Sequence, residues 1–274
     1  MALRTATNAV GKSIQQIKVS TGAASPSLGG IVVDGNILEN VSGTTTDSLV
    51  DTPGNYGDDT GLGGEVRGNY ATWNSLHKGN YTTLSNGNLD VVSTSWSSNI
   101  STIGMTSGKW YVEMTVVSGS STHASIGVSS IEGAPRDSYL GQTDDSYCWF
   151  AYPSNGLFNN SGYINQASDY QTALVNGDVV GMAIDMDNGT LKYYKNGNLL
   201  DSGNGFTGIT GTQFVATGGY SEKESWNFGQ RAWAHTPPSG YKALCTQNLP
   251  DPLVEDPSTY FDTKLYTSNS SNLS

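Results

Sequence analysis

Three aspartates in segment 185–203, DMDNGTLKYYKNGNLLDSG, are the residues whose types and spacing first suggest chemistry. Asp185 and Asp187 stand two positions apart and Gly189 follows them, as at the start of a calcium-binding loop. In such a loop the glycine is the sixth residue and a glutamate follows six positions later. Here the glycine comes one residue too soon and no glutamate follows at that distance. We therefore predict no metal site.

The same segment contains Asn-Gly twice, which is the strongest short-range signal for a tight β-hairpin. Two-residue turns at 188–189 and 196–197 would fold it into a three-stranded meander. The first turn would pair Asp187 with Thr190 and Asp185 with Lys192, and the second would pair Lys195 with Asn198. One face would then be apolar, with Ile184, Tyr193 and Leu200 in a row, and the other would carry a charge row of Asp185, Lys192 and Asp201.

No other residue pattern predicts catalysis or a cofactor. His77, His123 and His235 lie far apart, outside any zinc-ligand spacing. The Gly11-Lys12-Ser13 triplet lacks the earlier glycine of a phosphate-binding loop. Glu113 has no neighbouring carboxylate on its strand with which to hydrolyse a glycoside, and no Gly-x-Ser-x-Gly elbow occurs where a strand meets a helix. We expect no enzymatic activity and no cofactor.

Composition and charge exclude several classes of partner. The 274-residue chain has a formal net charge of −11, whereas binding through phosphates requires clustered Lys and Arg. Nucleic acid and anionic membranes are therefore not expected partners. The N-terminus has no uninterrupted apolar stretch, so we expect a soluble product without an ordinary signal peptide. Cys148 and Cys245 are either bridged or, as their burial propensity favours, two unpaired buried thiols.

Abundant Gly, Ser, Thr, Asn and Tyr predict an all-β chain of strands and turns. Short alternating segments recur from residue 80 to 232, as in an antiparallel β-sandwich. Residues 108–117 alternate most clearly, and we predict one face formed by Trp110, Val112, Met114 and Val116. Residues 1–60 are expected to form an extended N-terminal arm and residues 61–79 a loop-rich collar. Residues 233–274 are Pro-rich, which predicts an extended strap with a C-terminal strand.

The segment GDVVGMAIDMDNGTLKYYKNGNLL, residues 177–200, resembles a SPRY domain. GKWYVEMTV, ASIGVSS, QFVATGGY and WNFGQ follow in the order of that family. The resemblance implies a SPRY/concanavalin-like sandwich of two antiparallel sheets that binds its partners through loops at one edge. It implies no shared active site.

The flanking segments GNYATWNSL, TLSNGNLDV and FGQRAWAHTPPSGYKALCTQNLPDP look like those of marine tailed-phage virion proteins that carry this domain. The resemblance implies a structural component of a bacteriophage virion, in its head, tail or fibre, assembled in the host cytoplasm. Other virion proteins would be its partners, together with a host-surface protein or glycan, and we expect a homo-oligomer within the particle. A carbohydrate-binding lectin or glycan hydrolase, and an internal assembly factor, are the alternatives.

Segment 144–172 alternates aromatic residues with Asn, Ser and Gly, a composition typical of recognition loops. One interpretation is that Trp149, Phe150 and Phe158 belong to core strands and that only the Tyr and Asn side chains are exposed. We predict a mixture, in which the exposed ligand contacts are Tyr152, Asn155, Asn159, Asn160 and Tyr163.

The first 20 residues are basic within an acidic chain and contain short apolar runs. An extended segment of this kind can add a strand to a neighbouring protein. We predict that this segment anchors the chain to an acidic virion partner through Arg4, Lys12, Ile14, Ile17 and Lys18.

Overall fold

The computed structural model describes residues 31–33, 36–38, 59–66, 68–119, 123–151 and 156–250. The chain divides into two units, residues 1–51 and 52–274. In the first unit, β1 (Ile31–Val33) and β2 (Asn36–Leu38) form an antiparallel hairpin. The five predicted anchoring residues lie outside the described residues, so their role stays a prediction.

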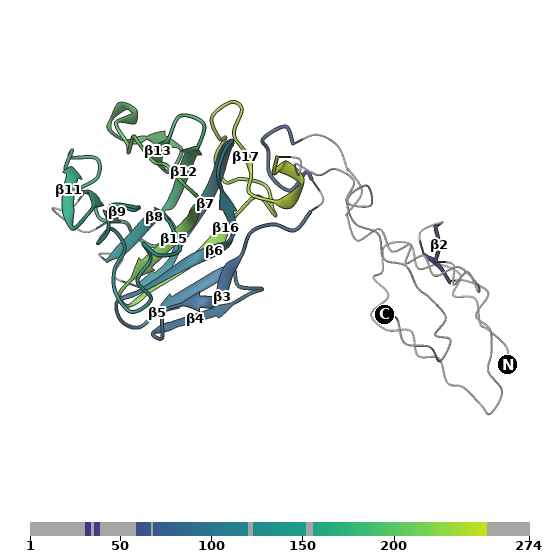
Figure 1. Ribbon diagram of the computed structural model, residues 1–274, viewed down its shortest axis with the longest axis horizontal. Coiled ribbons are helices and arrows are strands. Elements are labelled where there is room, and N and C mark those ends of the chain that lie inside the picture. The colour runs from purple at the N-terminus through teal and green to yellow at the C-terminus, as the bar shows by residue number, and fades with distance from the viewer. Residues whose placement is uncertain are drawn as a thin grey trace, which may run out of the picture. The chain divides into compact units, whose positions relative to one another are not determined.

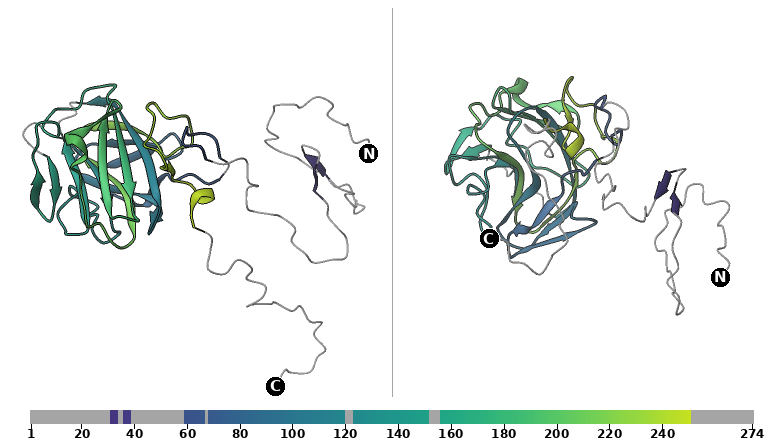
Figure 2. Two further views of the ribbon diagram at one scale, coloured as in Figure 1. Left: turned by 90° about the horizontal axis from the view of Figure 1, so that it is seen from above. Right: turned by 45° about the vertical axis from the view of Figure 1, so that its right-hand side comes forward.

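The second unit contains two antiparallel sheets packed face to face, as predicted (Figures 1 and 2). The seven-stranded sheet has the order β11-β10-β9-β8-β15-β6-β3. Its strands are β3 (Trp73–Lys78), β6 (Ser97–Met105), β8 (Ala124–Ser129), β9 (Ser146–Ala151), β10 (Leu157–Asn159), β11 (Gly162–Asn165) and β15 (Gln213–Gly219).

The eight-stranded sheet has the order β14-β13-β12-β7-β16-β5-β4, with β17 pairing with β7 in parallel. Its strands are β4 (Thr82–Ser85), β5 (Asp90–Ser93), β7 (Lys109–Gly119), β12 (Val179–Asp185), β13 (Thr190–Lys195), β14 (Asn198–Leu199), β16 (Glu222–Asn227) and β17 (Lys242–Ala243). Two short 3-10 turns, Leu200–Gly203 and Thr246–Asn248, complete the described secondary structure. Within the described part of the chain, no helix is long and apolar enough to cross a membrane.

The core between the sheets contains the apolar face predicted for β7. Trp110, Val112, Met114 and Val116 are all buried in it. Trp73 is also fully buried in this core, on β3. The structure therefore differs from the expected loop-rich collar, because residues 73–78 form an edge strand of the sandwich.

The first hairpin of the meander differs from its predicted register by two residues. Asp185 lies opposite Thr190, so the turn has four residues, 186–189, instead of two. Its cause is the Asp185 carboxylate, which accepts hydrogen bonds from the backbone N–H (3.0 Å) and the side-chain amide (2.9 Å) of Asn188. Of the turn residues only Gly189 has a positive φ, 61°. A shift of two leaves every side chain on its predicted face, and Ile184, Tyr193 and Leu200 are buried as expected.

The second hairpin has the predicted pairing of Lys195 with Asn198, and both turn residues, Asn196 and Gly197, have positive φ. The predicted charge row is wrong, however. Asp185 forms an ion pair with Lys109 of β7 at 3.3 Å, and Lys192 lies opposite Ala183. β14 ends at Leu199, so Asp201 belongs to the following 3-10 turn.

The described part of the Pro-rich strap, residues 233–250, lies against the outer face of the eight-stranded sheet and contains a turn at residues 239–240, the short strand β17 and the 3-10 turn Thr246–Asn248. The buried carboxylate of Glu113 on β7 accepts hydrogen bonds from the backbone N–H groups of Ala234 (2.8 Å) and His235 (3.0 Å). The Trp233 ring packs edge-on against Tyr111, with centroids 5.1 Å apart. This part of the sheet is therefore covered by the chain itself.

Candidate functional site

The predicted recognition segment forms β9, β10 and β11 at one edge of the seven-stranded sheet. Trp149 is fully buried in the core, whereas the next residue, Phe150, is only partly buried on the opposite face. Successive side chains of a strand point to opposite faces. The segment therefore serves both core and surface, as the mixed interpretation predicted.

The predicted ligand contacts differ in their surroundings. Asn160 is exposed in the turn between β10 and β11, and Tyr163 on β11 is 45% exposed. The Asn159 amide instead donates to the backbone carbonyls of Thr143, Asp144 and Ser146, at 3.2, 3.0 and 2.9 Å. Asn159 therefore holds the preceding loop in place. Tyr152 and Asn155 lie outside the described residues.

Tyr163 belongs to a continuous group of partly exposed rings, which we call the aromatic surface. Its neighbouring ring centroids are 5.0 to 6.1 Å apart. Its members come from three strands and four connecting segments: Trp96, His123, Tyr139, Phe150, Phe158, Tyr163 and Tyr220. These residues are spread over 125 positions of the sequence, and only folding brings them together.

A row of small residues explains how Trp96 reaches Phe150. Ser98, Gly218 and Ser125 are neighbours across β6, β15 and β8, and Phe150 follows them on β9. Adjacent strands lie about 4.8 Å apart, so a ring that spans this row needs small side chains beneath it. The Trp96 centroid lies 5.6 Å from that of Phe150 with an interplanar angle of 31°. The tryptophan therefore lies across the row.

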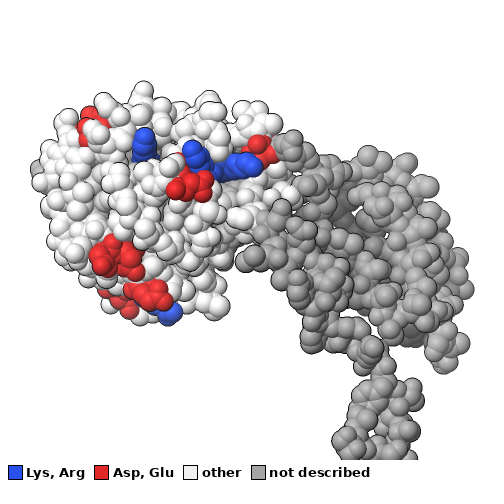
Figure 3. All heavy atoms as spheres, turned by 45° about the horizontal axis from the view of Figure 1, so that its top comes forward, with Lys and Arg blue, Asp and Glu red and all other residues white. Residues whose placement is uncertain are grey.

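The aromatic surface itself has no Asp, Glu, Lys or Arg. In the adjacent loop, Arg136 and Asp137 are exposed neighbours of opposite charge. Figure 3 shows one face of the molecule, on which some acidic and basic groups adjoin and most of the remaining described surface is uncharged. Partial burial raises the pKa of the Tyr163 hydroxyl above its usual value, and negative charge on Cys148 or Tyr139 would raise it further. The tyrosine is therefore a neutral hydrogen-bonding group at neutral pH.

Sequence reasoning identified one end of this surface and missed Trp96, His123, Tyr139 and Tyr220. Each of the four lies in a turn or connection next to Ser, Thr or Gly, where an aromatic side chain has no predicted place in a core. That position is a usable signal, but it does not show which of these residues meet. The strand order supplies that information.

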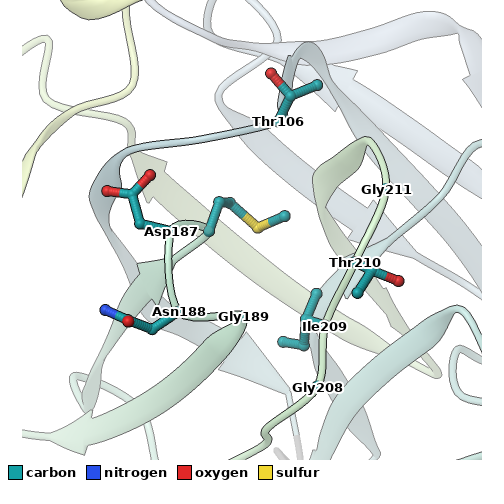
Figure 4. A pocket seen from close by; sticks show the side chains of 9 residues that line it. Thr106, Asp187, Asn188, Gly189, Gly208, Ile209, Thr210 and Gly211 are labelled. Atoms are coloured by element: carbon teal, nitrogen blue, oxygen red, sulfur yellow. The ribbon is translucent and has the colours of Figure 1, made fainter.

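The aspartates of segment 185–203 have structural partners. Asp187 accepts the backbone N–H of Gly108 at 2.7 Å, and Asp201 accepts the Asn165 amide at 2.7 Å. A recess lies between the turn at residues 186–189 and residues 208–211 (Figure 4). Among the residues that the structure describes, no group of three or more His, Cys, Asp and Glu side chains could hold a metal ion.

Burial raises the pKa of Asp185, but hydrogen bonds from Asn188 and the ion pair with Lys109 outweigh this effect and lower it below its usual value. The chemistry of Asp185 is therefore that of a turn cap and not of a proton donor. The two cysteines, Cys148 and Cys245, are buried and unpaired.

Residues 109–231 match the family model of the SPRY domain, and we identify this part of the chain as a SPRY domain with the SPRY/concanavalin-like fold. SPRY domains are binding modules that mediate protein–protein interaction, so the family supports a binding role. No curated protein sequence matches the chain.

Similar solved structures include the SPRY domain of human HERC1, with 21% identity, a TM-score of 0.45, and coverage of 56% of this chain and 96% of that chain. The PSpry domain of TRIM65 has 13% identity and a TM-score of 0.46, covering 58% of this chain and 89% of that chain. Stonustoxin has 20% identity and a TM-score of 0.42, covering 58% of this chain and 27% of that chain.

Proposed function

We propose that this protein is a non-enzymatic structural component of a tailed-bacteriophage virion, in which the SPRY domain is displayed as a binding module. The observation that carries the binding role is the aromatic surface. Large rings left partly exposed beside each other are unusual on a monomeric domain and mark interaction sites. Trp and Tyr are also the residue types that dominate binding energy.

The virion context rests on the resemblance of the segments on both sides of the SPRY domain to those of marine tailed-phage virion proteins. The fold is compatible with display, because the strap and the residues before β3 interlock on the described domain. Asp59 accepts hydrogen bonds from the Ala243 N–H (2.9 Å) and the Asn248 amide (2.7 Å). The described parts of both flanking segments are therefore tied to the sandwich, and the three strand members of the aromatic surface, Phe150, Phe158 and Tyr163, belong to the seven-stranded sheet and not to the sheet that the strap covers.

The experiment that tests this function is detection of the protein in purified particles. Mass spectrometry should find the chain at stoichiometric levels in density-purified particles, and its absence from them would refute the virion role. An antibody against Tyr139 and Tyr163, raised with the full chain and selected for loss of binding to their alanine variants, should label intact particles. A protein that is present but inaccessible to this antibody is an internal assembly factor instead.

The anchoring role of the N-terminal arm is tested separately. A chain lacking residues 1–40 should keep a folded SPRY domain but fail to enter particles. Reversal of the three basic residues, Arg4, Lys12 and Lys18, to glutamate should have the same effect if the virion partner is acidic. Normal incorporation of both variants would contradict anchoring by this segment and leave the binding role of the SPRY domain untouched.

A further inference from the structure

We propose that the aromatic surface binds a neutral oligosaccharide. This inference rests on the proposed binding role of the domain and adds the chemical class of its ligand. The spacing of the rings, the absence of charge among them and the polar groups that they carry all favour this class of ligand.

The spacing of the rings favours stacking on their exposed parts over insertion between them. Trp96, His123 and Tyr220 form a triangle with centroid separations of 5.6, 5.9 and 5.7 Å. Rings this close already contact each other, since paired aromatic rings lie about 4.5–7 Å apart. No slot remains between them for a proline ring or a cationic head group. A ligand must therefore lie across the group.

A chain of pairwise ring contacts connects the two ends of the surface, and successive rings are inclined to one another by 31 to 64°. From Tyr163 through Phe158, Phe150 and Trp96 to Tyr220, successive centroids are 5.0, 6.1, 5.6 and 5.9 Å apart. These steps are comparable to the length of one pyranose unit. An oligosaccharide that follows these contacts can thus place successive sugar rings near successive aromatic rings.

The electronic character of the surface suits a sugar. The faces of aromatic rings are electron-rich, and a pyranose presents faces of weakly positive C–H groups to them. Tyr139 and Tyr220 add phenolic hydroxyls that can donate or accept hydrogen bonds. Hydroxyl groups of a sugar can use these atoms at the margins of the stacked area.

Charge argues for a neutral ligand. None of the seven residues is Asp, Glu, Lys or Arg, and the exposed neighbours Arg136 and Asp137 have opposite signs. The surface therefore offers neither the basic cluster that a sulfated or carboxylated glycan needs nor the acidic one that a basic peptide needs.

The test uses the full chain and a panel of neutral hexasaccharides of glucose, galactose, mannose and N-acetylglucosamine, with hyaluronan and heparin fragments as anionic probes. Binding is followed by calorimetry and by tryptophan fluorescence. We expect at least one neutral oligosaccharide to bind, and Tyr163→Ala and Tyr220→Ala each to weaken that binding about tenfold, a typical loss for one stacked ring.

Ile164→Ala is the matched control, because Ile164 is the 59% exposed neighbour of Tyr163 on β11 and lies outside the aromatic surface. This variant should bind the glycan like the unaltered chain. Thermal unfolding of all three variants should match that of the parent, since each altered side chain is at least 42% exposed.

The glycan inference is overturned if no neutral member of the panel binds, if only the anionic probes bind, or if both tyrosine variants bind as the parent does. Capture of a host protein that depends on Tyr163 and Tyr220, without glycan binding, also overturns the glycan class while sustaining the binding role. Glycan binding by a protein that is absent from particles would sustain the glycan inference and refute the virion role.

Discussion

Replacement of Glu113 should release the strap from the eight-stranded sheet. The carboxylate is 3% exposed and accepts two backbone N–H groups of the strap. A hydrogen bond to a charged group contributes about 1.5–3 kcal/mol, so the two bonds together contribute about 3–6 kcal/mol. Removing the carboxylate also ends the cost of burying it, and water can reach the partly exposed strap. We therefore expect Glu113→Ala to lower the free energy of unfolding by about 2–4 kcal/mol.

The assay is urea-induced unfolding combined with amide hydrogen exchange, which reports on the strap directly. Exchange at Ala234 and His235 should accelerate in the variant. Glu113→Gln keeps one acceptor oxygen and should cost less, and Glu132→Ala, at an exposed loop position, should change stability by less than about 0.5 kcal/mol. A loss below about 1 kcal/mol for Glu113→Ala, or unchanged exchange at both amides, would refute the anchoring role of this carboxylate.

Gly189→Val should destabilise the domain by at least about 2 kcal/mol in urea unfolding. The φ angle of Gly189 is +61°, and the added Cβ would lie 2.5 Å from the Ile209 carbonyl oxygen. Asp185→Asn, which keeps the turn backbone, should cost less and leave binding at the aromatic surface intact. Hydrogen bonds and ion pairs outweigh burial and lower the folded-state pKa values of Asp185 and Asp178. These two carboxylates therefore stabilise the folded domain at pH values above their unfolded-state pKa near 4, and this stabilisation is lost as pH falls through their folded-state pKa values. The free energy of unfolding measured from pH 7 to 2 should show this loss, and a constant value would contradict it. Burial raises the pKa of the Cys148 thiol, so it should react with a thiol reagent only after unfolding, and rapid labelling of the native protein at Cys148 would show the burial to be wrong.

Local sequence patterns were sufficient for most of the sandwich. Alternation along β7 predicted its core face because the side-chain period of a strand is two, and positive φ at Asn196-Gly197 follows from the demands of a two-residue turn. The first hairpin was predicted two residues out of register. Asn-Gly also occurs there, but the Asp185 side chain supplies hydrogen bonds that favour a longer turn, and Met186 donates its N–H to Gly108 of a distant segment.

Partnerships between distant segments explain the remaining differences. Asp185 was predicted to face Lys192, but its cationic partner is Lys109, which becomes a neighbour only when β7 pairs with β12. Trp73 was predicted to lie in the loop-rich collar because its segment is dense in turn residues. Its place in the core depends on contact with Trp226 at a centroid separation of 4.8 Å.

The candidate site divides in the same way. The alternation of aromatic and small polar residues in segment 144–172 identifies a surface-forming element and places Tyr163 within it, because periodicity is a property of neighbouring residues. Periodicity does not reveal that the Asn159 amide donates its hydrogen bonds to backbone carbonyls. It also does not reveal that Trp96 packs against both Phe150 and Tyr220. Those contacts depend on the order β9-β8-β15-β6 and on the small residues Ser98, Gly218 and Ser125 along it. Strand order is a long-range property, so the chain reveals its binding surface only when the sheet is assembled.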